Sequence, residues 1–102
     1  MTHIDTLREA IEKLHGVTAT HVESVPVKEE HKGQTVWDGT VEVFDIQGHP
    51  KTDKAYAWLH DTGETTYPVT VLHIDPALTP ATAVRAFIVS QFRNLGVRDG
   101  QA

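Results

Sequence analysis

Histidine is the residue type best suited to chemistry in this chain, because its ordinary pKa lies near neutral pH. The 102 residues include seven histidines and no cysteine. The missing sulfur excludes disulfide scaffolds, thiol nucleophiles and zinc sites built on thiolates. The remaining candidates for chemistry are imidazole and carboxylate side chains.

Two pairs of metal-ligand residue types lie two positions apart, His21 with Glu23 and His73 with Asp75. Residues i and i+2 of a strand share a face, so each pair is expected to point to one side. His60 is expected in the strand next to His73, which makes a three-ligand site geometrically feasible. The spacing is not diagnostic, and surface histidines explain it better. We therefore predict no metal and no cofactor.

His49 lies in a stiff Gly-His-Pro turn, close in sequence to Asp45 and Asp53. A carboxylate that oriented this imidazole would make it a general base, but turn chemistry explains the motif equally well. The only serines are Ser24 and Ser90, and neither sits in a nucleophile-elbow pattern. We predict no catalytic residue, and the balance of the sequence favours a protein that is not an enzyme.

Hydrophobic periodicity predicts the elements that must hold these residues. Apolar residues recur at spacings of three and four over 3–15, which predicts a helix. A second amphipathic helix is predicted over 80–95, ended by Gly96. Residues 1–96 are then expected to form a single domain, with 97–102 as a flexible C-terminal tail.

Between the helices, β-branched segments alternate with turn-forming ones, which predicts an antiparallel meander. Pro26 cannot donate to a strand ladder, so its strand is expected at an edge. The element order is α-β-β-β-β-α. We predict an α+β fold, a two-layer sandwich with both helices on one face of the sheet. The four expected strands are 17–27, 35–46, 54–60 and 65–75.

Alternation along the strands predicts one small-residue face and one aromatic face. Folding about the 47–53 turn is expected to place Val43 near Ala57 and Phe44 near Tyr56. The register of the last two strands stays open by one residue, because Gly63 could host a bulge. In the alternative arrangement a helix covers the aromatic face and the alanine face is exposed. The aromatic face is expected to carry Phe44, Tyr56, Trp58 and His60.

Charge and hydropathy exclude several classes of partner. Nine basic residues against fourteen acidic ones leave a net charge of −5, which argues against nucleic acid and against anionic membranes. No apolar run approaches the ~18 residues of a membrane span. The N-terminal residues lack the pattern of a signal peptide, so a cytoplasmic protein is expected.

An aromatic sheet face without a covering helix would be too apolar for water, and such patches usually mark interfaces or ligand grooves. The leading hypothesis is a small non-catalytic binding or assembly module that forms a homodimer through this face. The alternative is a small enzyme or ligand carrier with a small-molecule pocket on the same face, using His60 and His73. A nucleic-acid module that stacks bases on aromatic rings is a weaker third. Further candidate polar groups are His49 and Asp75.

Overall fold

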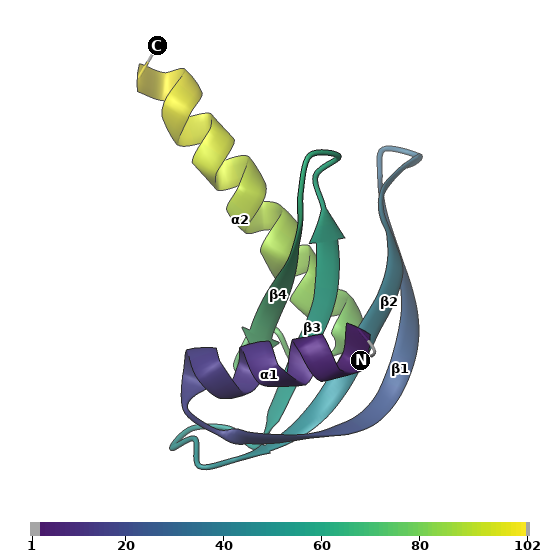
Figure 1. Ribbon diagram of the computed structural model, residues 1–102. Helices are drawn as coiled ribbons and strands as arrows, with labels where there is room; N and C mark the ends of the chain where they lie inside the picture. The colour runs from purple at the N-terminus through teal and green to yellow at the C-terminus, as the bar shows by residue number, and fades with distance from the viewer. Residues whose placement is uncertain (1–2, 102) are drawn as a thin grey trace.

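The computed structural model describes the backbone of residues 3–101 and the side chains of residues 3–91. The predicted order α-β-β-β-β-α is confirmed (Figure 1). The elements are α1 (His3–His15), β1 (Thr18–His31), β2 (Gln34–Gln47), β3 (Lys54–Asp61), β4 (Thr66–Leu72) and α2 (Pro80–Gln101).

The four strands form one sheet in the order β1-β2-β3-β4, with every neighbouring pair antiparallel. The predicted meander and α+β class are therefore confirmed. Pro26 lies in β1 and Pro68 lies in β4, which are the two edge strands. A proline there removes no hydrogen bond from the centre of the sheet.

The two helices lie on opposite faces of the sheet, so the prediction that both cover one face is wrong. Figure 1 shows α1 in front of the strands and α2 behind them. Alternate residues of β3 separate accordingly, with Ala55 and Ala57 packed beside α1 and with Tyr56 and Trp58 packed beside α2. The sheet is the middle of three layers. The buried core on the α1 side comprises Leu7, Ile11, Val17, Ala19, Phe44, Ile46, Ala55 and Ala57.

The strand register explains this difference. Val43 pairs with Tyr56 and Phe44 pairs with Ala55, each one residue away from the expected partner. A slip of one residue moves a side chain to the other face of a sheet. Phe44 therefore shares a face with the alanines of β3, and Tyr56 shares a face with Val43. Both faces become apolar enough to require a covering helix.

Strands β1 and β2 form a longer hairpin than the sequence predicts. Their pairing continues to His31 and Gln34, so most of the expected turn at 28–34 is strand. The turn itself is Lys32-Gly33, and both residues have positive φ values, 52° and 78°. This is the backbone pattern of a two-residue type I′ turn, whose twist matches that of the strands it joins.

The sheet divides at one end into two hairpins. Strands β2 and β3 pair only where residues 42–45 face residues 54–57. Beyond that point, 34–41 stay paired with β1 and 58–61 stay paired with β4. The β1–β2 and β3–β4 hairpins consequently diverge toward their tips (Figure 1).

Helix α2 is longer than predicted. The backbone of residues 97–101, expected as a flexible tail, continues the helix past Gly96 and projects beyond the sheet (Figure 1). One glycine costs a helix interior only about 1 kcal/mol. Residue 102 lies outside the described residues. Within the described part of the chain, neither helix is long and apolar enough to cross a membrane.

Candidate functional site

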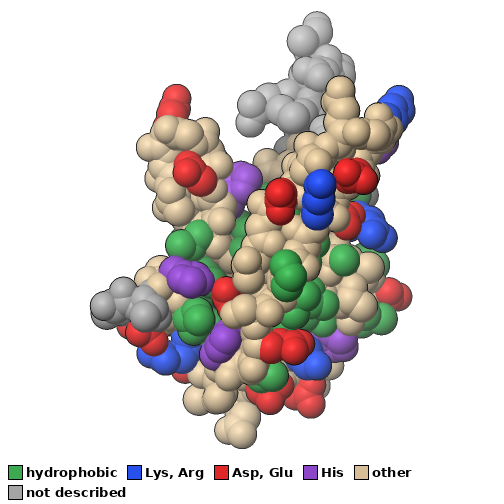
Figure 2. Space-filling model, turned by 90° about the vertical axis from the view of Figure 1, so that its right-hand side faces the viewer, with side chains coloured by type: hydrophobic (Ala, Val, Ile, Leu, Met, Phe, Trp, Pro, Cys, Tyr) green, Lys and Arg blue, Asp and Glu red, His purple; other side chains and the backbone are tan. Residues whose placement is uncertain are grey.

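A cleft of about 360 Å³ lies where the two hairpins diverge, and we call it the interhairpin cleft. Figure 2, a view onto the β1 edge, shows the hollow between the two projecting hairpins. One wall belongs to β2 and the other to β3, so two strand edges that do not pair with each other face the same space. The lining residues are Val36, Trp37, Asp38, Gly39, Thr40, Trp58, Leu59, His60 and Asp61.

Aromatic rings form the α2 side of the cleft. The rings of Trp37 and Trp58 meet edge to face, with centroids 5.6 Å apart. The ring centroid of Phe87 in α2 is 5.6 Å from that of Trp58 and 5.1 Å from that of His60. These edge-to-face contacts hold the rings in place, so the α2 side of the cleft is a preformed apolar wall.

Trp58 carries an unsatisfied polar atom. Its side chain is 2% exposed, and its indole Nε1 is buried with no hydrogen-bond partner among the described residues. Buried Trp N–H groups usually have a partner, and leaving a buried donor unpaired costs roughly 1–3 kcal/mol. The unpaired donor therefore belongs to a residue that lines the cleft.

The rim of the cleft is acidic. Asp38 of β2 and Asp61 of β3 are both exposed, and Asp61 accepts a hydrogen bond from the backbone N–H of Gly63 at 2.8 Å. Val36 and Leu59 add apolar surface, each with 39% of its area exposed. None of the described residues that line the cleft is a lysine or an arginine.

The predicted aromatic face is present but covered. Tyr56 and Trp58 share the face under α2 and are each 2% exposed. Phe44 lies on the opposite face against α1 and is fully buried. The expectation of one face free of helices is thus wrong, because α2 covers the aromatic residues. Of the predicted face, His60 is the residue that is half-buried and lines the cleft.

His73 does not join His60. It follows β4, and its Nδ1 shares a hydrogen bond of 2.6 Å with the Tyr56 hydroxyl. Burial raises the pKa of Tyr56 above its ordinary value, so the phenol stays protonated. The backbone N–H of His73 also donates to the Lys54 carbonyl at 3.0 Å. Asp75 is exposed in the loop before α2.

His49 has a local role in its turn. Its Nδ1 accepts a hydrogen bond from the backbone N–H of Lys51 at 3.0 Å. His15 lies near enough for an electrostatic effect: burial, and then the charge of His49, lower the pKa of His15. The Nε2 of His15 is 2.9 Å from the hydroxyl of Thr70 in β4. These contacts tie the end of α1 to the sheet.

A buried carboxylate cluster lies on the α1 face, and the sequence reasoning missed it. Glu42 is 2% exposed and accepts hydrogen bonds from the Ser24 hydroxyl, from His21 Nε2 at 2.8 Å and from His3 Nε2 at 3.2 Å. Burial works to raise the pKa of Glu42, but these three hydrogen bonds outweigh burial and lower it. The available signal was the single acid within the apolar run 41–44.

The expectation that His21 and Glu23 share one face of their strand is wrong. A β-bulge between them places His21 opposite Phe44 and Glu23 opposite Val43, which are neighbours on opposite faces. Ser24 and His21 both donate to Glu42, so no carboxylate–histidine–serine relay is formed. The described residues contain no group of three or more ligands able to hold a metal ion. The cluster is a structural clamp between α1 and the sheet.

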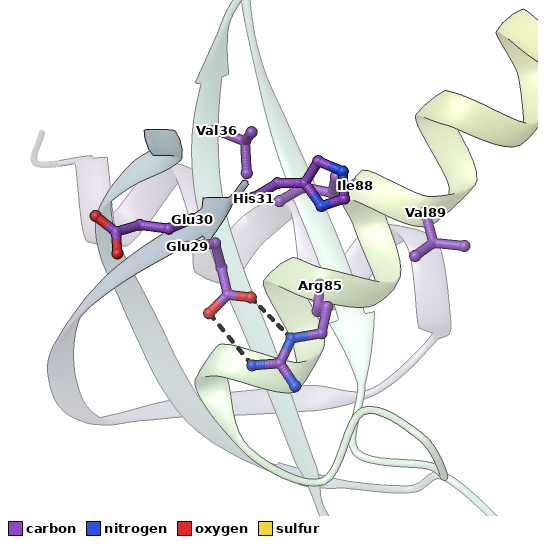
Figure 3. A pocket seen from close by; sticks show the side chains of 7 residues that line it. All are labelled: Glu29, Glu30, His31, Val36, Arg85, Ile88 and Val89. Carbon is purple, nitrogen blue, oxygen red and sulfur yellow. Dashed lines mark hydrogen bonds and ion pairs between the residues drawn. The ribbon is translucent and has the colours of Figure 1, made fainter. Parts of the chain in front are cut away.

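A second pocket of about 440 Å³ lies between the β1–β2 hairpin and α2 (Figure 3). The Arg85 guanidinium of α2 donates to the Glu29 carboxylate of β1, with Nε at 2.8 Å and Nη2 at 3.4 Å. The charges of Arg85 and Glu29 are therefore paired with each other. Most of the remaining pocket surface is apolar. Val36 lines both this pocket and the interhairpin cleft.

Comparison with protein families, with curated proteins and with solved structures found no match to this chain.

Proposed function

We propose that this protein is a small non-catalytic binding module and that the interhairpin cleft is its binding site. The observation that carries the proposal is the pair of β2 and β3 edges that face the same space without pairing with each other, beside Trp58, whose buried Nε1 has no partner among the described residues. Binding sites are typically concave and mostly apolar, with a few polar groups that fix the ligand. The cleft is concave, and it joins a wall of aromatic rings to polar groups in about equal measure.

The other titratable clusters support this reading, because they serve the fold. Glu42 accepts three hydrogen bonds, Tyr56 is hydrogen-bonded to His73, and His49 accepts from its own turn. Glu42 links α1 to the sheet, Tyr56 links the loop after β4 to the sheet, and His49 stabilises its own turn. The cleft is the place where exposed carboxylates, aromatic rings and two strand edges that do not pair with each other face a common space.

Self-association is a second proposal and concerns the pocket beside Arg85, which shares Val36 with the cleft. With the aromatic residues under α2, a second copy would meet exposed apolar residues outside that core. Val36 and Val89 flank the pocket beside Arg85 and are 39% and 48% exposed. We propose a homodimer through this surface. A stable mass of twice 11.3 kDa that becomes monomeric in Val89→Glu supports it, and a monomer at all concentrations contradicts it.

Intrinsic fluorescence tests the binding proposal directly. The chain has two tryptophans, and both line the cleft. Small molecules and short peptides are screened for a change in emission, with calorimetry as the independent measure of binding. Leu59→Arg should block the cleft. Leu14→Arg, at a 67% exposed position on α1, is the matched control.

The expected result is a ligand that changes the emission of the wild type and of Leu14→Arg but binds Leu59→Arg at least tenfold more weakly. Binding would instead be assigned to another surface if ligands bind by calorimetry, leave tryptophan emission unchanged and bind Leu59→Arg as well as the wild type.

A further inference from the structure

We propose that the occupant of the interhairpin cleft is an extended polypeptide segment with alternating basic and apolar side chains, which enters as an additional strand between β2 and β3. This inference rests on the proposed function and names its ligand class.

The backbone carries the first part of the argument. Main-chain N–H and C=O groups of a strand point alternately to its two sides. Along 34–41 one side of β2 pairs with β1, and along 58–61 one side of β3 pairs with β4. The other side of each strand faces the space between the two diverging hairpins, which we call the fork. In the fork, β2 and β3 do not pair with each other. A segment in the fork can therefore bond on both of its edges, whereas strand addition at an ordinary sheet edge uses only one.

The length of the fork sets the length of the segment. The shorter wall is the four-residue stretch 58–61, and strands rise about 3.3 Å per residue. The wall is thus about 13 Å long, which suits four to six residues of extended chain. Thr40 and Trp58 mark the inner end of the cleft, just beyond the paired residues Glu42 and Ala57.

Alternation decides which side chains the segment carries. Trp37, Trp58 and His60 lie on the α2 side, as their ring contacts with one another and with Phe87 show. Residues of opposite parity lie on the α1 side.

Asp61 is one residue from His60, and Asp38 is one residue from Trp37. Both carboxylates are therefore on the α1 side. An inserted strand would present one set of side chains to the indoles and the alternate set to the two carboxylates. The first set should be apolar and the second basic.

The charge of the cleft agrees with this ligand. The described residues that line the cleft include two acids and no lysine or arginine, in a chain of net charge −5. Opposite charge on the partner steers association and opposes wrong partners.

The test uses the full chain and three synthetic heptapeptides with blocked ends. The first alternates lysine and valine, the second alternates glutamate and valine, and the third is the lysine peptide with alternate backbone amides N-methylated. Binding is followed by tryptophan emission and by amide hydrogen exchange, resolved by residue. The lysine peptide should slow exchange within 34–41 and 58–61. The other two peptides should bind at least tenfold more weakly.

Charge variants test the basic class separately. Asp38→Asn and Asp61→Asn should each weaken the lysine peptide about three- to tenfold and reduce its salt dependence. Asp75→Asn, at an exposed loop position, is the matched control and should bind normally. Equal binding by all three variants overturns the assignment of a basic ligand.

The outcomes separate this inference from the proposed function. If the N-methylated peptide binds as well as its parent, strand insertion is wrong. If no peptide protects these amides at millimolar concentration while small molecules change the emission of the cleft tryptophans, the inference fails and the binding module stands. If nothing occupies the cleft, both fail. Protection of both 34–41 and 58–61 on concentrating the protein alone assigns the cleft to a second copy and overturns the inference.

Discussion

The indole of Trp37 lies over Gly39, where a side-chain carbon would come within 3.0 Å of its Cη2 atom. The absence of a side chain at 39 lets the ring fold across the β2 backbone and reach Trp58. This contact shapes the aromatic wall of the interhairpin cleft. Gly39 is therefore used for close approach of a ring, which is one of the reasons for glycine inside a strand.

Gly39→Ala should displace Trp37 and destabilise the protein by roughly 1 kcal/mol. This cost is at the low end for overpacking, because the Trp37 ring is half-buried and can shift. Urea unfolding measures the loss, and tryptophan emission reports the displacement. In a Trp37→Leu background the same substitution should cost much less. An equal cost in both backgrounds would show that the ring contact is not the cause.

Glu42→Gln should destabilise the protein by about 1–3 kcal/mol, because three donors lose a buried carboxylate. The lowered pKa of Glu42 means that its contribution is present above the ordinary value of 4.5 and is lost as pH falls through the lower folded value. The variant should lose less stability on acidification than the wild type. Asp45→Asn, exposed on the same strand, is the control. Parallel acid curves for wild type and Glu42→Gln would contradict the prediction.

His15 should make stability fall as pH drops through its ordinary pKa of 6.5. Because burial lowers the pKa of the folded imidazole, the unfolded chain takes up the proton first, and protonation favours unfolding. His15→Gln should flatten the decline in urea midpoint between about pH 7 and pH 5. His31→Gln, on the exposed hairpin, should not. The reverse ranking of the two variants would refute the assignment.

Tyr56→Phe should cost about 1 kcal/mol, since it removes a partly buried hydrogen bond of 2.6 Å to His73. The raised pKa of Tyr56 means that the wild type loses stability as pH rises through the ordinary value of 10.0, and this alkaline loss should shrink in the variant. Urea unfolding at neutral and alkaline pH measures both. Tyr67→Phe, at a 38% exposed site, should change stability little. If the two variants behave alike, the hydrogen bond does not stabilise the fold.

The helices and strands could be predicted because their signals are local. Apolar residues at helical spacing located α1, and β-branched runs between turn residues located the strands. Pro26 indicated an edge strand, and β1 is one. The prediction that α2 ends at Gly96 is wrong, because a glycine within a helix lowers the stability of the helix without necessarily ending it.

The positions of the side chains across the sheet could not be predicted in the same way. Val43 pairs with Tyr56 rather than with Ala57, and that single step moves Phe44 to the other face. Nothing local in the 47–53 turn distinguishes the two registers, so the choice depends on packing both faces at once. The bulge between His21 and Glu23 has the same effect on a smaller scale.

Periodicity along the chain and the missing N–H of proline were enough to predict the element order, the antiparallel meander and the edge position of β1. They could not predict that α1 and α2 lie on opposite faces, that Glu42 accepts hydrogen bonds from α1 and β1, or that β2 and β3 diverge around Trp37 and Trp58. These features depend on contacts between residues distant in the chain. Such contacts are set by register and by the simultaneous burial of two apolar faces, which no single segment encodes.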